Sequence, residues 1–507
     1  MSRRSIGFAL AFTLVLVVSC SVDSSRQAAG ALTFGQRTAV AVAGALPTAG
    51  AAGAIPPDEF PTMAGIDFAA FPVRVSLPPS PAPGGRVIHV EVGATGGNGT
   101  EGSPFGSPVR AVRAATSGDV VLVGDGTYRV SDRRCGCALA LWVDGVTLAA
   151  EHARSVTLVP GRNVVDGLQL RGEHLAVVGI RLRGFRDALT LGEEQHPVSD
   201  VVLQGLVLRG SGILMGLAES SNPAQPPVDG LLIADTRIIG GHHQVIGINC
   251  AQGPCDDVRV SGVTVTLTPS GSSNSGMDTI GFESGDNVVV EATDVTGADA
   301  DGIDLKASHA AVVNCYVHAM GRNGVKLWRG GDIINTIIVN TAADAAVVFK
   351  HPADYRILHS IVTRHIPDER AYTATVSYDD RGAGSLQVVN SIFYDNSGAL
   401  WISADYDVDI RNSIFFRSFT GGLVEWGDVL VEEGQGFGAL EAAGGGSDDR
   451  EVDPGFVDAA NNDFHLASGS PGLGAGTTAV DHYPKFDFAG QARGTNGAPN
   501  IGPYESG

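Results

Sequence analysis

The chain has 507 residues, of which 43% are hydrophobic and only 6% aromatic, and it contains 68 glycines. This length accommodates one large repeat domain or two to three ordinary ones, and the glycine content favours many tight turns over a large helical core. Acidic residues outnumber basic ones 55 to 34, for a formal net charge of −21. This charge argues against a nucleic-acid partner, because a phosphate backbone requires a basic face. It fits an exported protein or one that holds divalent cations.

The N-terminus has the features of an export signal. Two arginines precede an apolar run over residues 6–18, and the sequence "VVSC" then ends at Cys20. The run is too short to span a bilayer as a helix. "VVSC" resembles a bacterial lipobox, so residues 1–20 are predicted to be a lipoprotein signal peptide with Cys20 as the lipidated residue. The serine after Cys20 implies the bacterial outer membrane or cell surface, and the alternative is an ordinary cleaved signal peptide on an extracellular protein.

Residues 21–84 are rich in Ala, Gly, Pro and Ser and end in "LPPSPAPGG". This composition predicts a linker. The stretch "RVIHVEVGATGGNGTEGSPFGSPVRAVRAATSGDVVLVGDGTY" follows. It predicts a strand, a glycine-rich loop, a short helix from about Pro108 and a second strand. The helix is expected to cap a stack of strands and cover its exposed edge.

A repeat occupies the centre of the chain. Its frame is an apolar pair, a polar residue, a small residue and another apolar run, as in "VVNCYV" and "VVNSIFY". The frame is centred on Val178, Gln204, Ala234, Ser261, Glu291, Asn314, Asn335, His359, Asn390 and Asn412, which are 21 to 31 residues apart. Short β-branched strands at this spacing are typical of a β-solenoid, whose coils bury their apolar faces only when stacked. The recurring asparagines are predicted to form an internal ladder, each amide bonding to the next coil.

The segments that flank the repeats resemble a known group of proteins. The N-terminal "GNGTEGSPFGSPVRAVRAATSGDVVLVGDGTY" is similar to the entry segment of secreted right-handed parallel β-helix proteins of the pectate-lyase-like superfamily. "DPGFVDAANNDFHLASGSPGLGAG", "DFAGQARG" and "NIGPYE" resemble the closing segment of bacterial members. The resemblance implies an all-β chain with a right-handed parallel β-helix, a single-stranded solenoid with a short N-terminal capping helix, over residues 85–450. Residues 451–507 are the expected closing segment.

An acidic stretch lies within the repeats. Between Asp278 and Lys306 there are eight acidic residues, and Lys306 is the only lysine or arginine. Clustered carboxylates raise one another's pKa, which a hard cation such as calcium relieves. Stacking the repeats gives three columns of side chains: Asp278, Asp301, Asn323 and Asp344; Gly281, Asp304, Lys326 and Val347; and Glu283, Lys306 and Trp328. Coils about 4.8 Å apart bring these side chains within reach of one ion.

"ADGIDLK" followed by "NGVKLW" resembles the calcium-dependent lyases of polysaccharide lyase family nine. Carried over residue by residue, the resemblance implies that Asp301 and Asp304 are calcium ligands and that Lys326 is the catalytic base. Asp278 is the candidate ligand on the preceding coil. The family has two adjacent aspartates before the glycine, whereas this chain has an alanine before Asp301 and places Asp299 one position earlier. Asp299 is therefore a further candidate ligand.

The predicted reaction is calcium-assisted β-elimination on a uronate-containing polysaccharide. Calcium neutralises the carboxylate, Lys326 removes the C5 proton and water supplies a proton to the leaving oxygen. A nearby calcium ion or Arg329 is expected to lower the pKa of the lysine, which must be neutral to act as a base. Arg329, Trp328 and Lys306 are the predicted substrate-binding residues, and Trp328 and Tyr316 either stack on sugar rings or pack in the core. The expected partners are an acidic polysaccharide and, through the lipid anchor, a membrane, with the chain as a monomer.

Other interpretations stay open. In the first, the acids lie in solvated turns, because parallel β-helices place Asp, Asn and Gly in turns for backbone reasons alone. Lys326 then forms only a salt bridge with Asp304. "NSGMDTI" followed by "DADGIDLK" also resembles the polygalacturonases, glycoside hydrolases with paired carboxylates. However, Arg322-Asn323-Gly324 stands where that family has "GHG". A non-catalytic surface protein that binds glycan is the remaining alternative.

Overall fold

The computed structural model describes residues 69–193, 196–210, 212–217, 228–240, 245–247, 255–267, 278–297, 299–342, 345–365, 372–376, 382–494 and 497–505. All of them belong to one compact unit within residues 45–507. The predicted signal peptide, the lipidation site Cys20 and the column residue Asp344 lie outside the described residues. In the described part of the chain, no helix is long and apolar enough to cross a membrane.

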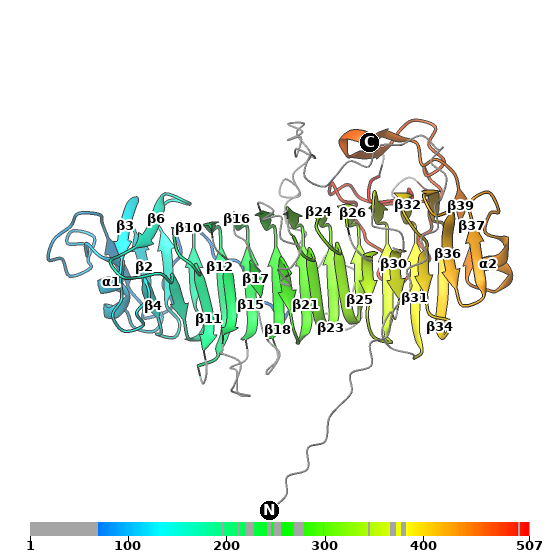
Figure 1. Cartoon of the computed structure of the whole chain (residues 1–507). Helices are drawn as coiled ribbons and strands as arrows, with labels where there is room; N and C mark the ends of the chain where they lie inside the picture. The colour runs from blue at the N-terminus through cyan, green and yellow to red at the C-terminus, as the bar shows by residue number, and fades with distance from the viewer. Residues whose placement is uncertain are drawn as a thin grey trace, which may run out of the picture. The chain divides into compact units, whose positions relative to one another are not determined.

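The described chain is almost entirely β-structure, in which short parallel strands stack coil upon coil (Figure 1). The predicted right-handed parallel β-helix is therefore confirmed. Helix α1 (Pro108–Ala114) begins at the expected proline and buries Val109, Ala111 and Val112. It lies between strands β1 (Val87–Val90) and β2 (Val120–Val123) in the sequence, as the N-terminal segment predicted.

Each coil contributes a strand to each of three faces. The first face contains β4 (Leu139–Leu141), β7 (Leu168–Leu170), β11 (Leu189–Glu193), β14 (Ile213–Leu217), β17 (Ile246–Gly247), β20 (Ile280–Phe282), β27 (Ala345–Phe349), β30 (Tyr372–Val376), β33 (Leu400–Ile402) and β36 (Gly422–Trp426). The second face contains β1, β2, β5 (Thr147–Ala150), β8 (Gly172–Glu173), β9 (Ala176–Val178), β12 (Val198–Gln204), β15 (Val228–Ala234), β18 (Cys255–Ser261), β21 (Asp286–Glu291), β28 (Asp354–Leu358), β31 (Gly384–Val389), β34 (Tyr406–Arg411) and β38 (Gly446–Ser447). Two longer strands, β23 (Ile303–Val313) and β25 (Val325–Ile334), run through both faces.

The third face is a separate 13-stranded sheet. It contains β3 (Gly126–Val130), β6 (Val156–Pro160), β10 (Ile180–Arg183), β13 (Val207–Arg209), β16 (Arg237–Ile239), β19 (Thr264–Thr266), β22 (Asp294–Thr296), β24 (Tyr316–Met320), β26 (Ile337–Thr341), β29 (Ile361–Thr363), β32 (Ile392–Asn396), β35 (Ile414–Ser418) and β39 (Arg450–Glu451). The remaining elements are β37 (Val429–Glu432), antiparallel to β36, helix α2 (Gly438–Ala442), the hairpin of β40 (Phe456–Asp458) and β41 (Asp463–Leu466), and the 3₁₀ turn η4 (Ala459–Asn461).

Stacked aliphatic side chains fill the interior of the coils. On the second face, strand pairing aligns Leu203, Ile233, Val260, Val290 and Val312 in one column, and all five are fully buried. Side chains alternate in direction along a strand, so the residues on either side of this column point outward. The β-branched residues that defined the repeat therefore form the core, as expected for a solenoid.

A tight turn joins the second face to the third. Its first residue has a left-handed backbone, with φ between 48° and 54° at Asn314, Asn335, His359, Asn390 and Asn412. Asparagine tolerates this conformation better than most residues, which explains its recurrence. In the earlier coils the predicted frame was one residue too early. Strand pairing aligns Glu291 with Val313, so the turn residue that corresponds to Asn314 is Ala292, with φ of 45°.

Among the described residues, the predicted ladder of asparagine amides is present at one step only, where Asn390 Nδ2 lies 2.9 Å from Nε2 of His359 on the preceding coil. Hydroxyl groups of the following residues form the continuous internal ladder. Each hydroxyl accepts a hydrogen bond from the buried backbone N–H of the coil before it. The pairs are Cys315 N to Thr336 Oγ1 (3.3 Å), Thr336 N to Ser360 Oγ (3.1 Å), Ser360 N to Ser391 Oγ (3.2 Å) and Ser391 N to Ser413 Oγ (3.2 Å). Asp449 Oδ1 continues the ladder by accepting from Ser413 N (2.9 Å).

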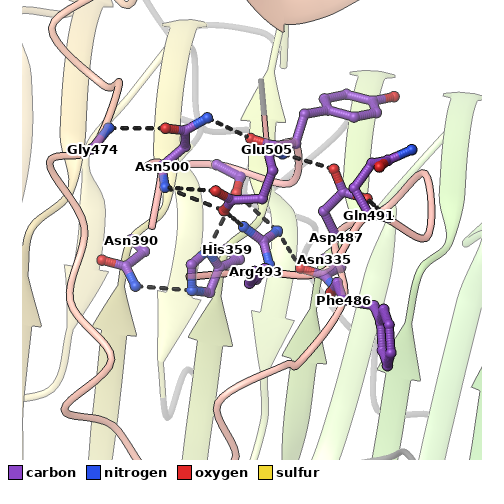
Figure 2. Close-up of polar contacts among 12 residues, drawn as sticks. Asn335, His359, Asn390, Gly474, Phe486, Asp487, Gln491, Arg493, Asn500 and Glu505 are labelled. Carbon is purple, nitrogen blue, oxygen red and sulfur yellow. Dashed lines mark hydrogen bonds and ion pairs between the residues drawn. The ribbon is translucent and has the colours of Figure 1, made fainter. Parts of the chain in front are cut away.

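The asparagine side chains instead hold the C-terminal segment, which runs back along the coils after β41 (Figure 2). Asn412 Nδ2 donates to Ala475 O (3.1 Å), and Asn390 Nδ2 donates to the carbonyl of residue 477 (2.7 Å). Asn335 Nδ2 donates to the carbonyl of residue 486 (2.7 Å), and its Oδ1 accepts from the buried Arg493 (2.8 Å). The segment also buries apolar residues of the third face: Tyr316, Ile337, Ile361, Ile392 and Ile414 pack with Phe464, Phe488, Ile501 and Tyr504.

Residues near position 71 also pack on the coils. Phe71 is buried against Val289 and Ala311 of the second face. The backbone N–H of Val75 donates to Gln204 Oε1 (2.9 Å), and its carbonyl accepts from Gln204 Nε2 (3.0 Å). The final part of the segment predicted as a linker over residues 21–84 therefore belongs to the folded unit.

Candidate active site

Three aspartates from neighbouring coils meet on the first face. Strand pairing places Gly281, Asp304 and Lys326 side by side on β20, β23 and β25. Asp278 and Asp301 precede β20 and β23 by two residues each. Carboxylate oxygens of Asp278, Asp301 and Asp304 all lie within 4.8 Å of one another, and all three residues are buried. The first two columns are thus as predicted over these three coils. The next coil is offset by one residue: Val348 rather than Val347 pairs with Lys326, and the same register aligns Ala345, not Asp344, with Asn323.

Burial makes this cluster of carboxylates electrostatically unfavourable. Burial and the neighbouring carboxylates of Asp304 and Asp301 raise the pKa of Asp278 to about 8. Burial and Asp301 also raise the pKa of Asp304, although Lys326 opposes the shift. Within the described part of the chain, no hydrogen-bond donor is recorded for the Asp278 carboxylate. Asp278 is therefore protonated at neutral pH unless a metal cation binds to the cluster.

Lys326 is the cation closest to the cluster. Its Nζ lies 3.1 Å from Asp304 Oδ2 and 3.4 Å from Asp301 Oδ2. Burial lowers the pKa of Lys326, but the carboxylates of Asp304 and Asp301 outweigh this effect and leave the pKa raised. The coil-to-coil ion pair considered from the sequence is therefore present. In the ion-free site Lys326 is an ammonium group and not a base.

Further hydrogen bonds orient Asp304 of β23 and Asp301, which precedes this strand. The indole N–H of Trp328 donates to Asp304 Oδ1 (2.6 Å), and the backbone N–H of Asn323 donates to Asp301 Oδ1 (3.1 Å). Arg322 Nε lies 3.8 Å from Asp301 Oδ1. Sequence reasoning missed Arg322 as a site residue, although it directly precedes Asn323 in the column that contains Asp301.

Positive charge gathers around the Trp328 ring. Lys306, Lys326 and Lys350 place their Nζ atoms 4.8, 5.0 and 5.5 Å from the ring centroid. Lys306 also pairs with Glu283, as the third predicted column implied. The sequence contains only four lysines, so three of the four converge on one ring. Lys350 was not singled out from the sequence, and the one available signal was this concentration of lysines within residues 306–350.

Three other predicted residues lie apart from the cluster. Asp299 is not among the three grouped carboxylates, and its backbone packs against Gly321 of the next coil. Arg329 is exposed and pairs along the strand with Ser308, and no contact with Lys326 is found among the described residues. Tyr316 packs under the C-terminal segment on the third face, where it stacks on His318, so it does not contact sugar at this site.

The donor set fits calcium. Calcium prefers carboxylate oxygens in irregular geometry, and Asp278, Asp301 and Asp304 offer three such groups from three coils. The Asp278 carboxyl has a raised pKa and accepts no hydrogen bond from the described residues. A bound cation would stabilise its ionised form. Lys326 and Arg322 offset part of the negative charge. Asp278, Asp301 and Asp304 are therefore the residues that would hold the ion.

No protein-family model and no curated protein sequence matches this chain. Solved structures do resemble it. Pectate lyase Pel9A is 11% identical, with a TM-score of 0.42, over 83% of this chain and 96% of that one. The complex of XylC with xylose is 8% identical, with a TM-score of 0.51, over 83% of this chain and 98% of that one. The PL6 family alginate lyase AlyGC is 11% identical, with a TM-score of 0.39, over 81% of this chain and 60% of that one. At such identities a likeness concerns the fold alone. The fold predicted from the terminal segments, a right-handed parallel β-helix, is the fold of this chain, and the similarity to XylC agrees with it.

Proposed function

We propose that the chain is a polysaccharide lyase that cleaves a uronate-containing polymer by calcium-assisted β-elimination. The observation that carries the proposal is the buried group of Asp278, Asp301 and Asp304 with the Lys326 ammonium beside two of them. A structural ion pair requires one carboxylate for each lysine. Three desolvated carboxylates around one lysine leave negative charge that a divalent cation balances.

The lysine is the proposed base. When bound, calcium neutralises a uronate carboxylate and so makes the adjacent C5 proton acidic. Once the aspartates share their charge with the ion, their hold on the Lys326 proton weakens and the pKa of the ammonium falls. Lys326 then takes the C5 proton, the C5 electron pair forms the C4–C5 double bond, and the bond from C4 to the leaving oxygen breaks. Water supplies the proton that the leaving oxygen takes up.

The surroundings of the site suit an acidic polymer. Lys306, Lys326 and Lys350 concentrate positive charge around Trp328 on a chain whose net charge is −21. This contrast favours a negatively charged substrate over a neutral one. Trp328 offers an aromatic surface for a sugar ring, and its N–H fixes its position through Asp304. Lys306 and the exposed Arg329 are the proposed partners of flanking uronates.

The proposal also places the chain outside the cytoplasm as a monomer. The apolar run and "VVSC" before residue 21 support export and lipidation at Cys20 in the bacterial outer membrane or at the cell surface. Distribution of the wild-type and Cys20→Ala chains between membrane and soluble fractions tests this part. We expect the wild type in the membrane fraction and the variant in the soluble fraction. Equal distribution of the two chains would contradict lipidation at Cys20 and favour an ordinary cleaved signal peptide on an extracellular protein.

The activity is tested by incubating the full chain with polygalacturonate and alginate, with and without a chelator. A chelator-sensitive rise in ultraviolet absorbance is expected, because elimination creates a double bond conjugated to the carboxylate. New reducing ends without that absorbance would indicate hydrolysis. Retained polymer binding with neither signal would leave the non-catalytic surface protein as the function.

Lysine substitution separates the base from the general charge of the site. Lys326→Ala should abolish turnover, while Lys485→Ala, which removes the one lysine away from Trp328, should leave turnover unchanged. Circular dichroism of both variants checks that the fold is retained. Turnover by Lys326→Ala would exclude Lys326 as the base.

One observation favours glycoside hydrolysis as the second candidate. The pKa of Asp278, raised to about 8, leaves a protonated carboxyl beside other carboxylates, as a general acid requires. The hydrolase needs no metal and no neutral lysine. Its activity would therefore persist in the chelator and in Lys326→Ala, and would be lost in Asp278→Asn.

A further inference from the structure

A row of arginines projects from the third face, away from the triad. Strand pairing aligns Arg183 on β10 with Arg209 on β13, and Arg129 on β3 lies two coils before Arg183 in the same column. The neighbouring column contains Arg181 on β10 and Arg237 on β16. All five side chains belong to exposed residues. The outward positions between them on β6, β13 and β16 hold only threonine, valine and isoleucine.

These arginines lack acidic partners. Among the contacts of the described residues, Arg129 donates to the carbonyl of Pro160 (3.0 Å), and no ion pair or hydrogen bond involves the side chains of the other four. No aspartate or glutamate occupies an outward position of β3, β6, β10, β13 or β16. The first such acid on this face is Asp294, two coils beyond Arg237, and it pairs with His318 (3.0 Å).

The arrangement is unfavourable for the isolated chain. Arg183 and Arg209 are directly paired on strands about 4.8 Å apart, and like charges in this position destabilise a sheet. Other exposed arginines of the chain do have acidic partners, as with Arg186 and Asp166 (2.9 Å). An excess of acids is thus available, yet none is placed beside the five arginines.

The C-terminal segment covers the later strands of the third face but not the strands that carry the five arginines. The C-terminal segment packs on its later strands, over Ile337, Ile361 and Ile392, while β3, β6, β10 and β16 lie beyond that cover (Figure 1). Within the described residues, no segment packs over the five arginines. The sheet there presents a flat surface with two columns of guanidinium groups along the stacking direction of the coils.

We propose that Arg129, Arg181, Arg183, Arg209 and Arg237 form a second binding surface, separate from the triad, for a linear polysaccharide that bears carboxylates. Guanidinium groups bind carboxylates through two parallel hydrogen bonds, which makes arginine better suited than lysine to this role. A stretched polyuronate presents carboxylates at regular intervals along the columns. The threonine hydroxyls between the arginines are available to the hydroxyl groups of the sugars.

The charge pattern favours this occupant over other anions. A membrane surface would be met by aromatic or large apolar side chains that insert between lipids, and no aromatic residue projects among the arginines. Single-stranded nucleic acid would require aromatic platforms for its bases, and the net charge of −21 opposes any nucleic acid. The inference holds whether or not the triad is catalytic.

Binding of the full chain to immobilised polygalacturonate and alginate tests the proposal, by biolayer interferometry in a chelator so that no polymer is cleaved. Arg183→Gln/Arg209→Gln is the test variant. Arg110→Gln/Arg133→Gln is the matched control, because it removes the same charge from exposed positions near the N-terminal cap. Each exposed ion pair contributes roughly a two- to fivefold change in affinity, so the test variant should bind about four- to 25-fold more weakly.

The control should bind as the wild type does, and binding should weaken as salt rises, because the contacts are exposed. Lys485→Ala, at the one lysine that lies away from Trp328, should keep full binding, so that the loss is specific to the arginines. Unchanged binding by Arg183→Gln/Arg209→Gln would overturn the proposal. Equal, arginine-dependent binding to methyl-esterified pectin, to anionic vesicles or to duplex DNA would also overturn it, because the surface would then not select a polymer of carboxylates.

Discussion

Calcium binding to Asp278, Asp301 and Asp304 should release about one proton per ion at pH 7. The pKa of Asp278 is raised to about 8 in the ion-free protein. A group with this pKa is protonated in roughly nine of ten molecules at pH 7, half of them at pH 8 and one in ten at pH 9. A carboxyl must lose its proton to become a ligand. The proton release should therefore fall from about 0.9 at pH 7 to about 0.1 at pH 9.

Titration calorimetry measures this release directly. The heat of calcium binding is recorded at pH 7 in buffers with different ionisation enthalpies, and the slope against those enthalpies gives the number of protons. The same coupling makes calcium affinity rise about tenfold per pH unit below pH 8 and level off above it. Thermal unfolding gives a second readout. Calcium at about one hundred times its dissociation constant should add roughly 2.7 kcal/mol to the free energy of unfolding.

Two aspartate variants make the test specific. Asp278→Asn should bind calcium more weakly and without the proton that Asp278 releases. Asp449 has a pKa that burial likewise raises to about 8, but it lies at the end of the hydroxyl ladder, beside Ser413. Asp449→Asn should therefore leave the calcium titration unchanged. Absence of calcium binding by the wild type would refute the metal site, and binding without proton release would refute Asp278 as a ligand.

Two further predictions concern the stability of the coils. Ser391→Ala removes the hydroxyl that accepts from the buried Ser360 N–H (3.2 Å), and should lower the free energy of unfolding by about 1 to 3 kcal/mol in chemical denaturation. A loss below the error of the measurement would mean that the ladder does not stabilise the coils. The pKa of Asp449 rises from 3.8 to about 8 on folding, so the native state binds this proton more tightly than the unfolded chain. The free energy of unfolding should therefore fall as the pH rises from about 4 to about 8, and Asp449→Asn should flatten this dependence and be the more stable chain at pH 9. Parallel pH profiles of the two proteins would contradict this cause.

Strand periodicity predicted the candidate site better than it predicted the turns. The pairing of β20, β23 and β25 is continuous, so counting residues along the repeat placed Asp304 beside Lys326 correctly. At the turn between the second and third faces the count was off by one residue in the earlier coils. The pattern of an apolar pair followed by a polar residue is met at Glu291, one position before the true turn residue, Ala292. What fixes the frame is a left-handed backbone, which glycine and asparagine indicate and which Ala292 hides.

Contacts between distant segments were beyond the reach of the sequence. Alanine, glycine and proline before residue 84 indicate a segment without a core of its own. That composition does not reveal that Phe71 packs on Val289 and Ala311. In the same way, the asparagine repeat suggested contacts between coils, whereas Asn335 bonds a carbonyl 151 residues later in the chain. Such partners depend on where the C-terminal segment returns, and no local pattern encodes that path.

Asp304 and Lys326 lie on the two longest strands described in the chain. β23 and β25 have 11 and 10 residues and pass from the first face to the second, with an irregularity in their pairing between Leu305 and Ser308. Their first halves carry Asp304 and Lys326, and their second halves lie under the terminal segments. Phe71 packs on Ala311 of β23, and His482 Nδ1 lies 2.7 Å from Asp332 Oδ2 of β25.

This continuity bears on how the carboxylates are brought together. Carboxylates on loops could move apart when their charges repel each other. Strands that are paired on both sides hold their side chains at a fixed spacing. Burial and the repulsion instead appear in the raised pKa of Asp278, which sits just before β20, and of Asp304 on β23. Calcium therefore needs to displace a proton from Asp278, and it does not need to rearrange the backbone that holds Asp304 and Lys326.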